Sequence, residues 1–359
     1  MKIAIIGSRG IPNNYGGFEQ FAEYLSAGLV ELGHKVYVYN SHNHSFQNSI
    51  WNGVNIIHCF DPEYKIGTFG QFIYDFNCII DSRKRKFDVI LQLGYTSSSI
   101  WNFLFKKTTR IVTNMDGLEW KRSKFSNSTK YFLKYAEKWA VKYSHTLISD
   151  SRGIQQYLLK KYHLKSEYIP YGAHIFNSPD PECLKEYQLS SGEYDLLIAR
   201  IEPENNVETI ISGFIQSKTK RKLVIVGNMN TKLGKKILSN FNDSRLIFLG
   251  YVSSLNILNN LRYYSNLYFH GHTVGGTNPS LLEAMASYAL ICAHQNIFNE
   301  SILGKEAFYF ENQFQITELL NSVNKSDFNS WQITNASKIS CTYQWSKIIS
   351  DYELVLKSF

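Results

Sequence analysis

The sequence predicts an α/β protein of two doubly wound Rossmann-like domains that face each other across a cleft. Short apolar runs alternate with amphipathic stretches from the N-terminus onward, as strand, helix and strand do in a parallel sheet. The alternation pauses over 171–193, where Gly172, Pro179, Pro181 and Gly192 indicate a linker, and then begins again. A length of 359 residues suits two domains of ordinary size.

The first domain is predicted to span 1–172. Gly33 follows its first amphipathic stretch and indicates the end of a helix. The predicted strands are 2–7, 36–39, 54–60, 88–93, 110–114, 146–149 and 168–170. The predicted helices are 18–32, 98–105, 130–143 and 152–162.

The second domain is predicted to span 173–340, and it repeats the same pattern. Its predicted strands are 196–199, 223–226, 246–249, 267–269, 290–292 and 308–310. Its predicted helices are 207–216, 232–239, 255–263 and 279–287. The last segment, 341–359, contains a helix over 343–357 that we expect to pack back on the first domain. Ligands of such folds bind at the carboxyl ends of the strands.

The net charge of +8 permits a nucleic acid, an anionic membrane surface or a phosphorylated substrate as partner. No nucleic-acid-binding module accompanies the basic residues, so nucleic acid is not expected. Four lysines spaced four residues apart would form either a functional basic stripe on a helix or simply a solvated face. They are Lys130, Lys134, Lys138 and Lys142.

The five cysteines have no metal-type spacing, so we expect neither a metal site nor a disulfide framework. No apolar run reaches the ~18 residues that a membrane span needs. The opening MKIAIIGSRG resembles a strand and a glycine turn rather than a signal peptide. We therefore expect a cytoplasmic protein, held peripherally at the inner face of the plasma membrane.

The first candidate site element is the glycine-rich loop 7–21, which follows a strand and opens a helix. Gly16 and Gly17 allow close backbone approach, and the helix N-terminus offers amides to an anion. The loop lacks the strict G-x-G-x-x-G pattern, and Asn40 stands where a nicotinamide enzyme would have an acidic residue. The alternative is a plain turn with a helix cap.

The second element, TNMDGLEWKR, places two carboxylates, Asp116 and Glu119, just after the predicted strand 110–114. Carboxylates at a strand end beside an aromatic residue suit sugar hydroxyl binding or general-base work. The alternative is that Asp116 only caps a helix.

The third element is Arg200, at a strand end, where a guanidinium can fork onto phosphate oxygens. The alternative is an ordinary surface arginine. Asn205 lies in the same loop, and Tyr251 follows the predicted strand 246–249. We assign both residues to the substrate-binding set.

The strongest element is HGHTVGGTNPSLLEAMA, in which a glycine turn precedes a helix with proline at its first position. Gly276, Thr277 and Asn278 would surround a diphosphate with backbone amides and a hydroxyl at the positive end of the helix dipole. Glu283, about one turn inside the helix, could accept hydrogen bonds from a sugar. Two histidines lack a third metal ligand, so His272 is interpreted as a polar residue near the reacting sugar.

Together these residues resemble glycosyltransferase family 4. The resemblance rests on GGFE, IPYGA, ARIEPENN and GGTNPSLLEAM, and it covers nearly the whole chain. It implies the GT-B fold, a nucleotide-diphospho-sugar donor, retention of anomeric configuration, and neither metal nor cofactor. The opening loop, NMDGLEWKR and GGTNPSLLEAM are also similar to a bacterial subgroup of rhamnosyltransferases of cell-surface polysaccharide assembly. This implies dTDP-rhamnose as donor and a saccharide as acceptor. A lipid-linked saccharide at the inner membrane surface would suit the basic residues of the first domain.

Three positions depart from the family pattern. Asn205 stands where the family usually has lysine, Gly275 replaces the first glutamate of its Glu-x7-Glu pair, and Asp116 replaces a histidine. The remaining catalytic set is Asp116, Arg200 and Glu283. Two other functions stay open: a nucleotide-sugar epimerase of the same fold, and a non-catalytic protein that binds nucleotide sugars.

Overall fold

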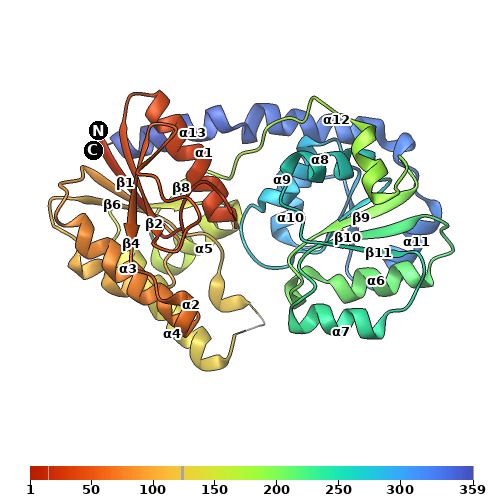
Figure 1. Ribbon diagram of the computed structural model, residues 1–359, viewed down its shortest axis with the longest axis horizontal. Coiled ribbons are helices and arrows are strands. Elements are labelled where there is room, and N and C mark those ends of the chain that lie inside the picture. Colours follow the sequence, from red (N-terminus) through yellow and green to blue (C-terminus); the bar gives the residue numbers. More distant parts are fainter. Residues whose placement is uncertain (15, 123–124, 359) are drawn as a thin grey trace. The chain divides into compact units, whose positions relative to one another are not determined.

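The computed structural model describes residues 1–14, 16–122 and 125–358, which form two compact units (Figure 1). Unit 1 comprises Met1–Tyr171 together with Trp345–Phe359, and unit 2 comprises Gly172–Gln344. Each unit contains one sheet with helices on both of its faces (Figure 1). The predicted class of two α/β Rossmann-like domains is confirmed.

Unit 1 has an eight-stranded sheet in the order β3-β4-β2-β1-β5-β6-β7-β8. Its pairs are parallel except for β3, which runs antiparallel to β4. The strands are β1 (Lys2–Ile6), β2 (Lys35–Ser41), β3 (Ile50–Trp51), β4 (Val54–Cys59), β5 (Val89–Leu93), β6 (Arg110–Asn114), β7 (Thr146–Ser149) and β8 (Glu167–Tyr168). The central strands are mostly apolar and buried, because helices cover the sheet on both faces.

Except for the four-residue helix Glu63–Ile66, which has no buried residue, the α-helices of unit 1 each bury one side. The α-helices are α1 (Gly17–Glu31), α2 (Glu63–Ile66), α3 (Phe69–Ser82), α4 (Asn127–Tyr143), α5 (Arg152–Tyr162) and α13 (Trp345–Lys357). Short 3₁₀ helices span Ser99–Leu104 and Glu119–Lys121. One core cluster joins α3 to the sheet through Tyr74, Cys78 and Ile79.

Helix α13, at the end of the chain, packs on α1 (Figure 1). Tyr24 stacks on Trp345 with ring centroids 4.7 Å apart, and Tyr352 lies 5.1 Å from Phe21. The Asn114 amide, at the end of β6, donates to the buried Tyr352 hydroxyl at 2.9 Å. The last helix therefore forms part of the core of unit 1, although the chain reaches it only after passing through unit 2.

Unit 2 has a six-stranded sheet, parallel throughout, in the order β11-β10-β9-β12-β13-β14. Its strands are β9 (Tyr194–Ile198), β10 (Lys222–Val226), β11 (Leu246–Gly250), β12 (Tyr268–His270), β13 (Ile291–His294) and β14 (Phe308–Phe310). The α-helices are α6 (Val207–Gln216), α7 (Lys232–Asn240), α8 (Leu255–Tyr264), α9 (Pro279–Ala286), α10 (Ile297–Leu303), α11 (Gln313–Ser322) and α12 (Asn329–Lys338). Three further helices are the 3₁₀ helices Pro181–Tyr187, Pro203–Asn205 and Lys325–Phe328, and a π-helix spans Ile339–Tyr343.

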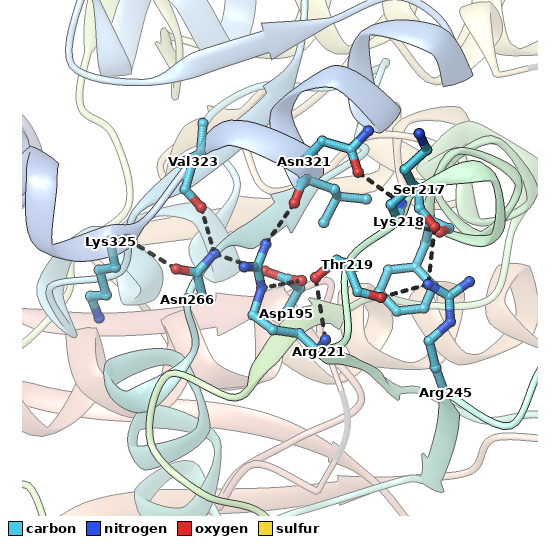
Figure 2. Close-up of polar contacts among 12 residues, drawn as sticks. Asp195, Ser217, Lys218, Thr219, Arg221, Arg245, Asn266, Asn321, Val323 and Lys325 are labelled. Carbon is cyan, nitrogen blue, oxygen red and sulfur yellow. Dashed lines mark hydrogen bonds and ion pairs between the residues drawn. The ribbon is translucent and has the colours of Figure 1, made fainter.

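A polar network ties strands and helices together at the amino edge of the unit 2 sheet (Figure 2). Asp195, which is fully buried, accepts from Arg221 Nε at 3.0 Å and from the Asn266 amide at 3.1 Å. The same Asn266 amide group donates to the Val323 carbonyl, and its oxygen accepts from the backbone N–H of Lys325. Because the carboxylate is out of water, its charge is compensated by these partners and by a backbone hydrogen bond from Leu267.

The structure differs from the sequence-based expectation in the irregular segments. The predicted helix 98–105 is a 3₁₀ helix, Ser99–Leu104, and the prediction missed α2 and α3 altogether. It also missed β3, α10, α11 and α12. Within the described residues, no helix combines the length and the apolar character that crossing a bilayer requires.

Candidate functional site

Several predicted site residues follow the strands of unit 2 at one edge of its sheet. Arg200 comes two residues after β9 and its side chain is exposed. Tyr251 follows β11 directly and is 56% exposed. Because every pair in this sheet is parallel, both residues lie at the carboxyl edge, where open α/β folds bind ligands.

The loops that follow β9 and β12 are fastened to each other at this edge. The side-chain amide of Asn205 donates to the Arg200 carbonyl at 2.7 Å, and its oxygen lies 2.8 Å from His272 Nδ1. Asn206 donates to the Gly271 carbonyl at 2.8 Å. A Cβ at Gly271 would lie only 2.0 Å from the Asn205 carbonyl oxygen, so the close approach requires glycine there. Arg200, Asn205 and His272 therefore form one linked group.

The glycine turn before α9 lies against His272. Gly275 has φ of 135°, and a Cβ there would meet His272 Nε2 at 3.0 Å. A glutamate at this position would need both a different backbone conformation and a displaced imidazole. The geometry of this loop therefore favours glycine at position 275.

Helix α9 begins as the sequence predicts, with Pro279 at its first turn. The Asn278 side chain caps the helix by accepting from the Ser280 amide at 2.9 Å. Thr277 is buried, and Gly276 is half-buried. This end of α9 combines a glycine turn, a hydroxyl side chain and the positive end of a helix dipole, which is the arrangement that binds phosphates in other proteins.

Glu283, one turn into α9, forms an ion pair with an arginine that the sequence analysis did not single out. Arg262 Nη2, on α8, lies 2.7 Å from the Glu283 carboxylate and 3.0 Å from the Ser280 hydroxyl. The Arg262 side chain is 1% exposed and that of Glu283 is 15% exposed. Tyr268, at the start of β12, completes the cluster through its hydroxyl, 2.9 Å from Ser280. The carboxylate is thus held by a buried cation.

His270, the other histidine of this motif, is buried at the end of β12. Burial lowers the pKa of His270 to about 3, and the nearby His272 and Arg262 act in the same direction. The imidazole is therefore neutral at physiological pH. Among the described residues, no group of three or more His, Cys, Asp and Glu side chains is arranged to hold a metal ion.

In unit 1, the glycine-rich loop is organised around Glu19. Gly16 caps α1 with φ of 127°, and a Cβ there would lie 2.1 Å from a Glu19 carboxylate oxygen. Gly17 is the first residue of α1. Glu19 is buried and accepts from the Arg9 backbone at 2.8 Å, while the Arg9 side chain pairs with Glu63 at 2.7 Å. Burial raises the pKa of Glu19 above its ordinary value.

Asn40, near the end of β2, binds the same loop through two hydrogen bonds. Its side chain accepts from the Ile11 amide at 3.0 Å and donates to the Ile11 carbonyl at 2.8 Å. A Cβ on Gly10 would lie 2.4 Å from the Asn40 side chain, so a larger residue cannot occupy this position without a shift. Asn40, which stands where a nicotinamide enzyme would have an acidic residue, therefore fixes the glycine-rich loop to the end of β2.

The carboxylates of the second motif lie just beyond β6. Asp116 has φ of 46°, a left-handed conformation that non-glycine residues adopt mainly at turns and functional sites. It precedes no helix directly, since the following 3₁₀ helix begins at Glu119 with Leu118 before it, so the alternative of a helix cap is wrong. Glu119 pairs with Arg122 at 2.7 Å, within the same loop.

This loop is anchored by a buried glutamate on α4. Glu137 is 1% exposed and accepts from Trp120 Nε1 at 3.0 Å and from the hydroxyls of Tyr157 and Tyr162 at 2.8 and 2.7 Å. Lys161 adds an ion pair at 2.7 Å. Four donors satisfy the carboxylate, which thereby fixes the Asp116 loop to α4 and α5.

Sequence reasoning missed one further carboxylate in unit 1. Asp75, on α3, is buried and accepts from the Ser97 hydroxyl at 2.6 Å. Burial raises the pKa of Asp75 to about 7. The sequence holds no signal for it, since an aspartate on an amphipathic helix usually faces water.

The structure brings together four of the predicted positions in unit 2, namely Arg200, Asn205, His272 and Gly275. The functional roles of all predicted site residues stay predictions.

Two family models match this chain. Residues 186–326 match "Glycosyl transferases group 1", and residues 1–174 match a domain of unknown function, DUF1972. No curated protein matches the sequence.

Solved structures with the same fold cover nearly the whole chain. Sucrose-phosphate synthase from Thermosynechococcus elongatus has a TM-score of 0.78 at 12% identity, over 99% of this chain and 98% of that one. Anabaena Alr3699/HepE, solved in complex with UDP-glucose, has a TM-score of 0.75 at 13% identity, over 100% and 99%. The α,α-trehalose 6-phosphate synthase of Burkholderia multivorans has a TM-score of 0.73 at 10% identity, over 100% and 98%. At these identities the likeness concerns the fold, which is the GT-B fold of glycosyltransferases.

Proposed function

We propose that this chain, a nucleotide-sugar-dependent glycosyltransferase of group 1 (family 4) with the GT-B fold, is a retaining and metal-independent rhamnosyltransferase. Its donor is dTDP-rhamnose and its acceptor is a saccharide carried on a lipid, in the assembly of a cell-surface polysaccharide. The observation that carries the proposal is the linked group at the carboxyl edge of the unit 2 sheet, where Arg200, Asn205 and His272 adjoin the glycine turn of α9.

The diphosphate of the donor binds between Arg200 and the first turn of α9. The exposed guanidinium forks onto phosphate oxygens, while the amides near Thr277 and Asn278 and the helix dipole meet the remaining charge. When the bond between the anomeric carbon and the phosphate oxygen breaks, the leaving nucleotide diphosphate gains negative charge. The same groups then stabilise the transition state more than the ground state, which is the condition for catalysis.

Glu283 and His272 contact the transferred sugar or the ribose. The buried Arg262 holds the Glu283 carboxylate in one orientation, and Asn205 fixes the ring orientation of His272. Preorganised polar groups of this kind bind hydroxyls with little loss of entropy on binding. Tyr251, exposed after β11, offers its ring to the base of the nucleotide.

The acceptor binds to unit 1, at the carboxyl edge of its sheet. Gly16 and Gly17 let the protein backbone approach the acceptor closely, and Asp116 and Glu119 bind the acceptor hydroxyls or take the proton of the attacking one. The strained backbone at Asp116 supports a functional role for that residue, because such conformations concentrate at active sites.

Gly275 supports a 6-deoxy sugar as the transferred group. Where the family pattern has a glutamate, this chain has a glycine whose Cβ position is closed off by His272. A 6-deoxy sugar has one hydroxyl fewer to satisfy, and a carboxylate left without a partner in a closed site costs about 1–3 kcal/mol. The missing carboxylate therefore fits rhamnose better than glucose or mannose.

The test compares donors and nucleotides side by side. Thermal unfolding is measured with dTDP, UDP and GDP, since a ligand that binds only the folded chain raises the apparent melting temperature. Transfer is then measured from dTDP-rhamnose, UDP-glucose and GDP-mannose. The largest shift with dTDP and transfer from dTDP-rhamnose are expected. A larger shift with UDP or GDP, with transfer from the matching sugar, contradicts the donor but leaves the transferase intact.

A second experiment separates the transferase from the two other functions. Product analysis without any acceptor would reveal an epimerized nucleotide sugar if the chain were an epimerase. Nucleotide binding without turnover of any donor, across a panel of acceptors, would indicate a non-catalytic binding protein. The proposal expects neither: donor is consumed only when a suitable acceptor is present, apart from slow hydrolysis.

A further inference from the structure

Beyond its first turn, helix α4 exposes only lysines and aromatic residues. The exposed residues of this helix from its second turn onward alternate between the two types at helical spacing. They are Tyr131, Lys134, Tyr135, Lys138, Trp139 and Lys142, here called the α4 stripe. We propose that the α4 stripe is a membrane-docking surface that lies flat on an anionic lipid bilayer. This inference rests on the proposed function and deepens it, because it names the surface that would bring the enzyme to a lipid-linked acceptor in the membrane.

The charge of the stripe is of one sign because the only acid of α4 is turned inward. The sequence of α4 contains Glu137 as its sole acidic residue beside four lysines. Glu137 is 1% exposed, and its carboxylate is engaged by Trp120, Tyr157, Tyr162 and Lys161. The exposed lysines of α4 therefore have no acidic neighbour on their own helix. A surface of this kind complements the negative potential of anionic lipid headgroups.

The aromatic residues of the stripe form a ladder along the helix. Tyr131, Tyr135 and Trp139 are 63%, 43% and 37% exposed. Neighbouring rings in the ladder have centroids 5.0 Å and 6.3 Å apart, and the two tyrosine hydroxyls are 3.1 Å apart. Large rings with one polar atom each prefer the boundary between headgroups and acyl chains. In water their exposed area is unfavourable, which is the driving force for insertion.

The apolar surface continues from α4 onto α3, which lies beside it in Figure 1. Phe132, next in sequence to the ladder, contacts Phe72 of α3 with centroids 5.6 Å apart. Phe72 in turn lies 6.2 Å from Phe69, which is 76% exposed. Ile73, on the same helix, is 40% exposed. Two helices of unit 1 thus offer exposed apolar side chains linked by ring contacts.

An anionic bilayer suits this surface better than a second copy of the chain. In a two-fold dimer through the stripe, the lysines of one copy would face those of the other, and like charges at short range oppose association. A helix that lies in the interface plane instead needs an apolar side flanked by cations. The α4 stripe has that composition, and the 17-residue helix has too many charges to cross the bilayer.

The experiment measures sedimentation of the full-length chain with vesicles of phosphatidylcholine, alone or mixed with phosphatidylglycerol. Two variants separate the contributions. Tyr131→Ala/Tyr135→Ala/Trp139→Ala removes the rings and keeps the charge, and Lys134→Gln/Lys138→Gln/Lys142→Gln does the reverse. A matched control, Lys232→Gln/Lys235→Gln/Lys236→Gln, removes three exposed lysines from α7 in unit 2. Circular dichroism and dTDP binding verify that each variant is folded.

The unaltered chain is expected to bind the mixed vesicles and to bind phosphatidylcholine alone much more weakly. Each basic residue at an anionic surface strengthens binding by a factor of about five, so the α4 lysine variant should lose about a hundredfold. The α7 control should lose less than tenfold. The ring variant should also bind weakly, and what binding it keeps should dissociate at lower salt than that of the unaltered chain.

Three outcomes overturn the inference. They are equal binding of the α4 and α7 lysine variants, equal binding to both kinds of vesicle, and a dimer in light scattering that the ring variant turns into a monomer. Failure here is distinguishable from failure of the proposed function. Donor binding and transfer to a water-soluble acceptor do not depend on the α4 stripe, so they would persist in every variant.

Discussion

Arg262 and Glu283 form a buried ion pair in unit 2, with Nη2 of the arginine 2.7 Å from the carboxylate. The arginine side chain is 1% exposed and also donates to Ser280 and Asn259. Because the guanidinium is out of water, it depends on the carboxylate of Glu283 for most of its compensation. Glu283, proposed to bind the donor, therefore also stabilises the fold.

Substitution of Glu283 should accordingly affect both stability and donor use. Glu283→Ala leaves a buried charge without its partner and should lower the free energy of unfolding by about 3–5 kcal/mol. Glu283→Gln keeps a hydrogen-bond acceptor for Arg262 and should lower it by only about 1–2 kcal/mol. Chemical denaturation measures both values, and transfer assays well below the unfolding transition measure donor use.

The Gln variant is the informative one for function. It should remain folded and yet lose most of its transfer activity, because a neutral amide is a weaker acceptor for sugar hydroxyls than a carboxylate. Normal kcat and KM for the donor in Glu283→Gln would show that Glu283 supports only the fold. Glu182→Gln, which alters an exposed pair with Lys185 in the same unit, serves as the control.

Asn205 is expected to support donor binding through the loops that it joins. Asn205→Ala removes the bonds to the Arg200 carbonyl and to His272, and the loss should cost about 1–3 kcal/mol of stability. The KM for the donor should rise about tenfold because Arg200 and His272 lose their fixed positions. Isothermal titration with dTDP checks this. Asn240→Ala, on the exposed side of α7, should change neither quantity.

Asp75 should make the stability of the chain fall as pH rises toward neutrality. Burial raises its pKa from 3.8 to about 7, so between these values the folded chain binds a proton that the unfolded chain has lost. Stability from this group is present below pH ~4, declines up to pH ~7 and is constant above it, with a total near 4 kcal/mol from a shift of about three units. Asp75→Asn should abolish this decline.

The measurement is urea unfolding of both proteins at several pH values between about 4 and 8. The difference between the unaltered chain and Asp75→Asn should grow in favour of the variant as pH rises through this window. A difference that is independent of pH would mean that Asp75 is ionised in the folded state throughout.

The network around Asp195 should matter for stability and not for catalysis (Figure 2). Asp195→Ala leaves Arg221 and the Asn266 amide without their carboxylate, and a loss of about 3–5 kcal/mol is expected. The network lies at the amino edge of the unit 2 sheet, opposite to the edge that carries Arg200. The folded fraction should therefore keep its KM for the donor. A raised KM at a temperature where the variant is folded would contradict this separation.

Transfer should survive a chelator, because in the proposed function Arg200 and the amides at the start of α9 meet the charge of the diphosphate. Activity in EDTA should equal activity in magnesium, and Arg200→Gln should lose activity by about 10²–10³-fold, as expected when a group that stabilises developing charge is removed. Loss of activity in EDTA that manganese or magnesium restores would contradict the metal-independent proposal. Lys218→Gln, a surface substitution in unit 2, is the charge-matched control.

The regular elements were predictable because their signals are local. Strands such as Leu246–Gly250 and helices such as Lys232–Asn240 follow from apolar periodicity, and Pro279 and Asn278 mark the start of α9 by known helix-start chemistry. The segment that holds α2 and α3 was missed, since its aromatic residues do not separate cleanly into a buried and an exposed face. Several of them, including Phe69, are exposed in the fold.

The sequence by itself determined the α/β class, the two-part organisation and the position of each motif at a strand end, because these depend on neighbours a few residues apart. Only the tertiary structure decided which side chains are engaged with one another. Arg262 and Glu283 are 21 residues apart, Asn205 and His272 are 67 apart, and no local pattern marks either pair. The tertiary structure also decided which side of α4 is buried: Glu137 lies in the interior, and the lysines and rings of the α4 stripe lie at the surface. Long-range pairing and burial depend on how whole helices and strands pack together, so they can be seen only in the folded structure and not in the local sequence pattern.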